Sequence, residues 1–171
     1  MLKEKNLVEV RDQVRIQDGT AVTLSTIQDA LKDSANRHGV AMAFENDQAK
    51  FGGIIGGATY DCLVIYHPDH KKDYYNFVVI VKYQGNYAFV STFMTGISKQ
   101  IGRDINRDQA GADFKGSFKR MVDDPDLTGA VGQLIGSGVK ALFSLGRNKQ
   151  KLEEERNWYA MADDMFDEIL A

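Results

Sequence analysis

The stretch HPDH, residues 67–70, holds the most concentrated chemistry in the sequence, because two imidazoles and a carboxylate fall within four residues. Imidazole nitrogens and carboxylate oxygens are common ligands of zinc and other transition metals. His67, Asp69 and His70 are therefore the candidate metal ligands. The remaining histidine, His38, falls on the apolar face of a predicted helix, where a core or capping role is more common. The sequence therefore offers no further histidine ligand to complete a metal site with the HPDH residues.

Cys62 is the only cysteine and a conceivable nucleophile, with His67 as its base. A reactive cysteine needs an accessible, electropositive surrounding that stabilises the thiolate. Cys62 instead lies in the apolar run CLVIY, which favours a small buried hydrophobic residue. One cysteine allows no intramolecular disulfide, and the charged start MLKEKNLVEV does not resemble a signal peptide, so we expect a cytoplasmic protein.

The glycine-rich stretch FGGIIGG, residues 51–57, resembles a phosphate-binding loop only in composition. Such loops follow a strand and open a helix, whose amides then face the phosphate. This stretch precedes a predicted strand, and no Gly-Lys-Ser/Thr ends it. It predicts a flexible connection or a close approach of two backbones, and we expect no cofactor.

Most of the tyrosines gather in a region that is rich in β-branched and aromatic residues: Tyr60, Tyr66, Tyr74, Tyr75, Tyr83 and Tyr87. Aromatic side chains on a sheet can stack on bases, but nucleic-acid binding also needs a basic groove. Only Lys71, Lys72 and Lys82 lie nearby, and the net charge is -3, so we expect no nucleic-acid partner. Ordinary cross-strand pairing and a protein-binding sheet face both remain open.

Residues 127–146 form an apolar stretch with one charge, Lys140, and a G-x-x-x-G at Gly132 and Gly136. On a helical wheel its polar residues segregate to one side, which is typical of a helix packed on a protein core. Its glycines make it a poor isolated helix, and its length barely spans a bilayer. We expect it to pack on the sheet; an oligomer contact and a membrane-associated regulator are the alternatives.

The tail KLEEERNWYAMADDMFDEILA, residues 151–171, is also amphipathic, with acidic residues on one side. Its apolar face must be covered either by the body of the same chain or by a second subunit or partner. The candidate partner-binding residues on that face are Trp158, Tyr159, Met165, Phe166 and Ile169. Because the tail is acidic, we expect it not to bind an anionic membrane.

Patterns along the chain predict the other elements. Alternating residues indicate a strand over 7–16, with a helix as the alternative because Leu7, Val10 and Val14 also have helical spacing. Asp18-Gly19 indicates a turn into a second short strand. Ser25 and Gln28 form a predicted capping box for a helix that ends at Gly39, followed by a strand over 40–44. Three strands then form an antiparallel meander between Ala58 and Met94, and a helix is expected over 112–122.

These elements predict an α+β fold: an antiparallel sheet of about five strands with one early helix and two or three C-terminal helices packed on it. Residues 1–146 form the expected domain, and residues 147–171 form an amphipathic helix that either belongs to it or serves assembly. The leading hypothesis is a non-enzymatic, cytoplasmic protein-binding, adaptor or chaperone-like domain, with a protein partner or as a homodimer. A metal-dependent enzyme or metal-binding protein centred on the HPDH loop is the alternative.

Overall fold

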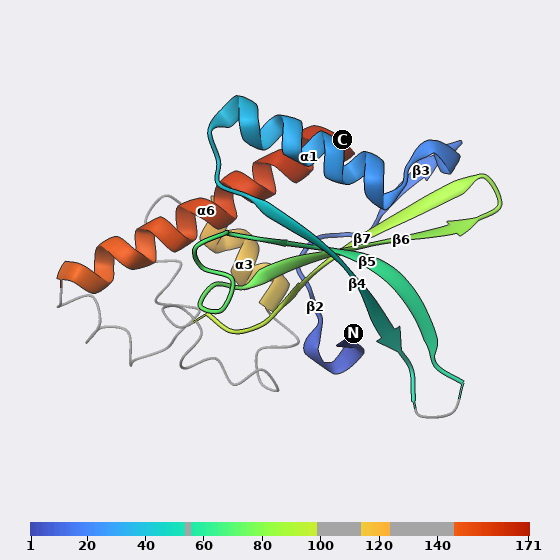
Figure 1. Ribbon diagram of the computed structural model, residues 1–171, viewed down its shortest axis with the longest axis horizontal. Coiled ribbons are helices and arrows are strands. Elements are labelled where there is room, and N and C mark those ends of the chain that lie inside the picture. Colours follow the sequence, from blue (N-terminus) through green and yellow to red (C-terminus); the bar gives the residue numbers. More distant parts are fainter. Residues whose placement is uncertain (54–55, 99–113, 124–145) are drawn as a thin grey trace.

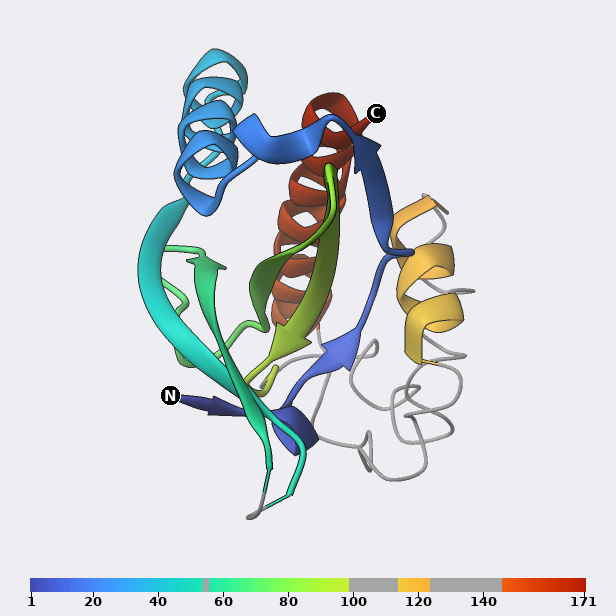
Figure 2. The ribbon, with the colours of Figure 1, turned by 90° about the vertical axis from the view of Figure 1, so that its right-hand side faces the viewer.

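The computed structural model describes residues 1–53, 56–98, 114–123 and 146–171, which form a curled, mostly antiparallel sheet with helices on one side (Figure 1; Figure 2). The predicted α+β class is confirmed. The strands are β1 (Leu2–Lys3), β2 (Val8–Glu9), β3 (Val14–Gln17), β4 (Ala43–Phe51), β5 (Ala58–Tyr66), β6 (Asn76–Gln84) and β7 (Tyr87–Thr95). The sheet order is β1-β4-β5-β6-β7-β2, and β3 also pairs with β7; only the β1–β4 pair is parallel.

The predicted strand over 7–16 is divided into two short strands, β2 and β3. Between them the backbone N–H of Val10 still bonds Thr92 O at 3.2 Å, and the side chain of Gln13 bonds Ser91 Oγ at 2.8 Å. The predicted second strand after Asp18 is wrong. Asp18 takes a left-handed conformation with φ 52°, and the chain enters the 3-10 turn η2 (Gly19–Ala21), which leads directly into helix α1 (Leu24–His38).

The N-cap of helix α1 lies two residues earlier than the sequence suggested, at Thr23 instead of Ser25. Thr23 and Thr26 form the capping box, with Thr26 N donating to Thr23 Oγ1 at 3.1 Å and Thr23 N to Thr26 Oγ1 at 2.9 Å. Gly39 ends the helix with φ 65°, as expected. His38 is not on the buried face: its side chain is 55% exposed and faces Glu168 at 3.5 Å.

Strand β4 differs from the predicted strand over 40–44: it begins at Ala43 and continues to Phe51. Nine register pairs join β4 to β5, from Ala43–Tyr66 to Phe51–Ala58. The glycine-rich stretch is the turn of this hairpin, and its residues 54–55 lie outside the described residues. A Cβ at Gly57 would stand 2.7 Å from Phe51 O, so the expected close approach of backbones is confirmed.

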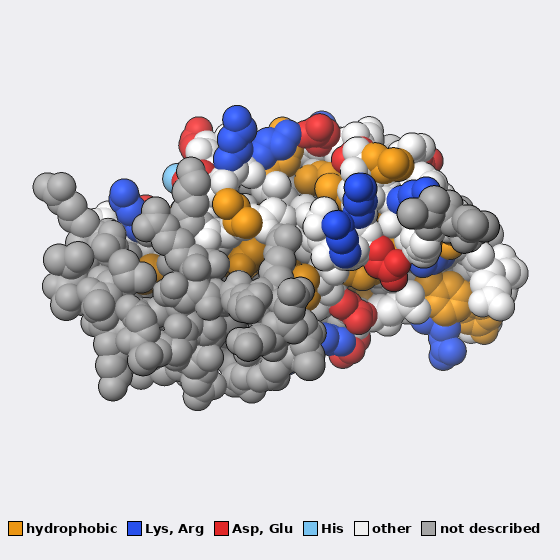
Figure 3. Space-filling model, turned by 90° about the horizontal axis from the view of Figure 1, so that it is seen from below, with side chains coloured by type: hydrophobic (Ala, Val, Ile, Leu, Met, Phe, Trp, Pro, Cys, Tyr) orange, Lys and Arg blue, Asp and Glu red, His pale blue; other side chains and the backbone are white. Residues whose placement is uncertain are grey.

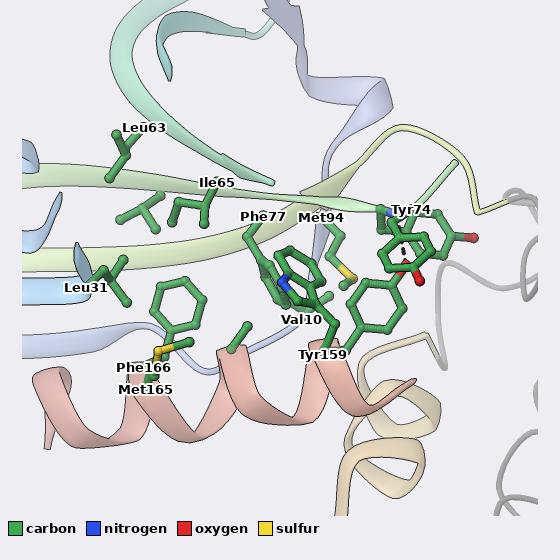
Figure 4. Packing of buried hydrophobic residues seen from close by; sticks show 14 of the residues in the cluster. Val10, Leu31, Leu63, Ile65, Tyr74, Phe77, Met94, Tyr159, Met165 and Phe166 are labelled. Atoms are coloured by element: carbon green, nitrogen blue, oxygen red, sulfur yellow. Dashed lines mark hydrogen bonds between the residues drawn. The ribbon is translucent and has the colours of Figure 1, made fainter. Parts of the chain in front are cut away.

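The predicted meander is confirmed, and β6 is its central strand. Alternate residues of β6 enter two separate cores: Phe77 and Val79 face the helices, whereas Val78 and Ile80 face the opposite side. Figure 4 shows how side chains from β5, β6 and β7 meet those of the last helix, α6 (Gly146–Leu170). The second core joins residues of β4, β5 and β6 to partly buried side chains from the N-terminal segment, Leu2 and Leu7.

Two helices after the sheet are described, and they take different positions. Helix α6 lies across the sheet, while the short α3 (Phe114–Asp123) packs at the edge against β2 and α6. The predicted two or three C-terminal helices packed together on the sheet are therefore not matched. The segment 127–146, apart from its last residue, lies outside the described residues. Within the described ranges, no helix is long and apolar enough to cross a membrane.

Candidate functional site

The predicted metal ligands lie in the loop between β5 and β6, where each histidine has a local partner. His67 Nδ1 accepts a hydrogen bond from the Asp69 backbone N–H at 3.1 Å, and His70 Nδ1 lies 3.1 Å from Asp73 Oδ2. The His70 ring stacks on Tyr74, with centroids 4.2 Å apart and planes 6° apart. Among the residues with assigned positions, no group of three His, Cys, Asp or Glu side chains is placed to hold a metal ion.

Cys62 is fully buried in the second core, between strands β4 and β6. Burial, followed by the negative charge of Asp47, raises the pKa of the thiol to about 11. A thiol with this pKa is protonated at neutral pH and is a poor nucleophile. The structure therefore places Cys62 where the sequence suggested, as a small apolar side chain in a strand.

The candidate partner-binding residues of the tail point into the sheet of the same chain (Figure 4). Trp158 is 3% exposed, and its indole N–H donates to Ala41 O at 2.8 Å. Tyr159, Met165 and Phe166 are buried in the same core, and Ile169 packs against it. Binding of another protein by this face stays a prediction, and in this conformation the chain itself covers the face.

A buried polar group lies beside this aromatic cluster in α6. Tyr159 Oη donates to Glu155 Oε1 at 2.5 Å and accepts from the backbone N–H of Tyr75 at 2.8 Å. Glu155 is fully buried, and its second oxygen, Oε2, has no hydrogen-bond partner among the described residues. Burial raises the pKa of Glu155 to about 7, although hydrogen bonds from Ser98 and Tyr159 act in the opposite direction. Glu155 does not line any of the three hollows formed by described residues.

The most distinctive surface feature is a split between two long hairpins. The β4–β5 and β6–β7 hairpins each carry nine register pairs, but β5 and β6 are joined by only three, between Leu63–Val79 and Ile65–Phe77. Beyond Leu63 the end of the β4–β5 hairpin turns away from the end of the β6–β7 hairpin (Figure 1). We call the region between these two hairpin ends, where side chains of β5, β6 and β7 line a hollow, the cleft.

The cleft exposes backbone groups that a continuous sheet would pair. Along a strand, N–H and C=O groups point alternately to one neighbour and then to the other. Val81 and Tyr83 follow Val79 at intervals of two, so their backbone groups have the same direction as those of Val79, toward β5. The register between β5 and β6 stops at Val79, and β6 therefore has a free edge over its last residues within the described chain.

The cleft contains a hollow of about 560 Å³. Its walls come from β5, β6, β7 and the segment before β3, namely Gln13, Tyr60, Val81, Lys82, Tyr83, Gln84 and Phe89. Lys82 extends over the aromatic side chains of the β4–β5 hairpin: its Nζ lies 4.3 Å from the ring centroid of Tyr60 and 4.9 Å from that of Phe51. The hollow thus combines aromatic rings, amides and one ammonium group, and none of its lining residues is acidic.

Lys82 belongs to a row of side chains that crosses three strands on one face. Phe89 of β7 is the register partner of both Lys82 in β6 and Arg15 in β3. The guanidinium of Arg15 lies 5.8 Å from the ring centroid of Tyr87. Neither cation forms an ion pair with a carboxylate among the described residues. In the view from below, basic and hydrophobic side chains also lie next to each other (Figure 3).

The sequence indicated part of this site. Tyr60 and Tyr83 belong to the tyrosine-rich region, whereas Tyr74 and Tyr75 of the same region are buried under α6. Gln13, Lys82 and Phe89 were not predicted as site residues. The available signal was Lys82 itself, a lysine inside the otherwise apolar run FVVIVKYQ. Comparisons with protein-family models, with curated proteins and with solved structures find nothing that matches this chain.

Proposed function

We propose that this chain is a non-enzymatic, cytoplasmic protein-binding module that captures an extended segment of a partner protein in the cleft. The observation that carries the proposal is the early end of the β5–β6 ladder, three pairs long between hairpins of nine pairs each. An exposed strand edge offers a row of N–H and C=O groups to which another chain can add a strand.

The dimensions of the cleft support a peptide as its occupant. Its hollow of about 560 Å³ falls within the range of small-ligand pockets and is open along the edge of β6. Main-chain hydrogen bonds to β6 would supply affinity, and the side chains of Tyr60 and Phe89 would select alternate residues of the peptide. Tyrosine and phenylalanine are enriched at protein interfaces because they bury large areas at low entropic cost.

The remaining chemistry of the described residues supports binding over catalysis. The one thiol is buried and protonated, and the histidines of the HPDH loop are engaged with Asp69 and Asp73. Glu155 has a shifted pKa but lies in the core, away from the described hollows. A protein-binding role in the reducing cytoplasm agrees with a single cysteine that serves packing.

Peptide display on the purified chain tests this proposal. We expect selection from a library of linear dodecapeptides to enrich a family of sequences with alternating character. Synthetic peptides from that family would then be methylated at one backbone nitrogen at a time. Loss of affinity at every second position, with tolerance between, is the signature of strand addition, since only alternate N–H groups face the partner strand. Uniform tolerance of methylation would contradict it.

Two tyrosines of β5 provide a matched pair for the same assay. Tyr60 and Tyr66 lie on one face of β5 and each has a lysine over its ring, Lys82 at 4.3 Å and Lys71 at 4.5 Å. Only Tyr60 lines the hollow. Tyr60→Ala is expected to abolish peptide binding, whereas Tyr66→Ala leaves it intact. Equal effects of the two substitutions would contradict peptide binding in the hollow. Oligomerisation detected by light scattering would indicate that the cleft binds a second copy of the chain instead of a peptide.

A further inference from the structure

We infer that the partner segment carries an acidic side chain that pairs with Lys82, so that the cleft selects acidic extended peptides. This inference rests on the proposed function and adds to it the chemistry of the partner. Its basis is a cation in a partly buried, aromatic setting that the described chain leaves without a carboxylate.

Two aromatic rings fix the position of the Lys82 ammonium. Its Nζ lies over the rings of both Tyr60 and Phe51, which themselves pack edge to face at 5.8 Å. Aromatic faces attract a cation but leave its remaining hydrogen-bond donors free. The ammonium is thus held at the wall of the hollow with donors available to a ligand, and an anionic group is the complement that its charge requires.

Strand addition brings a side chain of the partner to the correct place. A residue directly opposite Lys82 on an added strand would have its Cβ roughly 4.5–5.5 Å from that of Lys82, on the same face of the sheet. Asp or Glu at that position reaches the ammonium, whereas Lys or Arg there meets a like charge. Acidic selectivity at one fixed position of the peptide follows from this geometry.

Other cations extend the positive character around the cleft. Arg15 lies across Phe89 from Lys82, at two strand spacings, or roughly 10 Å. A second hollow, of about 390 Å³, lies at the β1–β4 edge, and Lys3, Lys5 and Lys50 line it together with one carboxylate, Glu4. Glu4 already accepts the Gly52 N–H at 2.8 Å. These cations favour an acidic partner at the contact itself.

Two acidic residues of this chain's last helix, Asp163 and Glu168, are engaged in contacts far from Lys82. Asp163 pairs with Arg11, and Glu168 accepts from Ser34 and Arg37, each at 2.6 Å. These contacts hold the carboxylates on the helical side of the molecule, where they stabilise the docking of α6. Among the described residues no carboxylate pairs with Lys82, and we assign the anion opposite it to a separate polypeptide.

Peptide display with a charge exchange tests the inference. The full chain, Lys82→Glu and Lys72→Glu are each presented with the same library of linear dodecapeptides. Lys72 is an exposed lysine of the β5–β6 loop, so Lys72→Glu makes the same change in net charge outside the cleft. We expect Asp or Glu at one fixed position for the full chain and for Lys72→Glu, and Lys or Arg at that position for Lys82→Glu.

Affinity measurements complete the test. The acidic peptide selected by the full chain should bind Lys82→Gln about tenfold more weakly, the loss expected for one charge-assisted contact of about 1.4 kcal/mol. Peptides with no acidic preference, or with a preference that Lys82→Glu leaves unchanged, would overturn the acidic partner while retaining peptide binding. Failure to enrich any peptide family would instead overturn the proposed function. The two failures are thus distinguishable.

Discussion

Glu155 and Tyr159 lie one helical turn apart in α6 and are joined by a 2.5 Å hydrogen bond inside the core. The same tyrosine hydroxyl accepts the backbone N–H of Tyr75, so the pair fastens the helix to the segment that begins β6. The second carboxylate oxygen of Glu155 has no partner within the described part of the chain. A buried, incompletely bonded acid makes the stability of the fold depend on pH.

Glu155→Gln should stabilise the protein above neutral pH. Because the pKa of Glu155 rises from 4.5 to about 7 on folding, the wild type loses stability as pH increases through that window, and the loss is complete above pH 7. The expected difference from Gln is about 3 kcal/mol at pH 8 and decreases toward pH 5. Urea unfolding of both proteins at several pH values measures it. Parallel pH profiles would contradict the assignment.

The ion pairs of Arg11 with α6 should be unequal in their effects. Arg11 contacts both Asp163 and Asp167, but the side chain of Asp163 is 12% exposed and that of Asp167 is 69% exposed. Asp163→Asn is expected to cost about 2–4 kcal/mol, since it removes the buried carboxylate and leaves the guanidinium with the exposed Asp167 and the backbone oxygen of residue 163, and Asp167→Asn less than about 1 kcal/mol. Chemical denaturation gives both values. Similar losses of stability in Asp163→Asn and Asp167→Asn would show that the burial of the carboxylate does not determine the strength of its ion pair with Arg11.

The start of α1 allows a direct test of the observed cap against the predicted one. Thr23→Ala removes the acceptor of the Thr26 N–H and should destabilise the fold by about 1 kcal/mol. Ser25→Ala alters the residue that the sequence pattern favoured, but should change stability by less than about 0.5 kcal/mol. Thermal unfolding of the two variants measures both effects. A larger loss of stability for Ser25→Ala than for Thr23→Ala would support Ser25, the predicted residue, as the N-cap.

The HPDH loop should not bind zinc stoichiometrically. His67 Nδ1 is occupied by the Asp69 N–H, and among the described residues no three His, Cys, Asp or Glu side chains are arranged to hold a metal ion. We expect metal analysis of protein purified with zinc to find far less than one equivalent, and a zinc excess to leave the melting temperature unchanged. One equivalent of zinc that is lost in both His67→Ala and His70→Ala would establish the metal-binding alternative.

The sequence predicted those elements whose pattern is local. The strands of the meander are apolar and β-branched, and the Gly39 cap depends on one residue, so both were visible in the residues alone. The strand predicted here was shorter than β4 because residues 45–48 are all polar and lack alternation. The extension of β4 to Phe51 depends on its pairing with β5. Periodicity cannot show pairing with a distant segment.

The candidate site was harder to predict than the fold. The cleft arises where β5 and β6 diverge, and this divergence depends on the twist of two hairpins rather than on any motif. Tyr60, Lys82 and Phe89 come from three strands and meet only through the register. The tail residues were correctly recognised as an apolar face, but the sequence alone left open what covers it.

Residues 2–9 join opposite edges of the sheet: Leu2 pairs with Ala49 of β4, and Val8 pairs with Met94 of β7. These residues leave the ribosome well before either partner, as does Arg11, whose contact Asp163 is 152 residues away. The meander pairs neighbouring segments and therefore has the lowest entropic barrier to formation. We therefore expect folding to start in the middle of the chain and to be completed when residues 2–9 pair with the outer edges of the sheet.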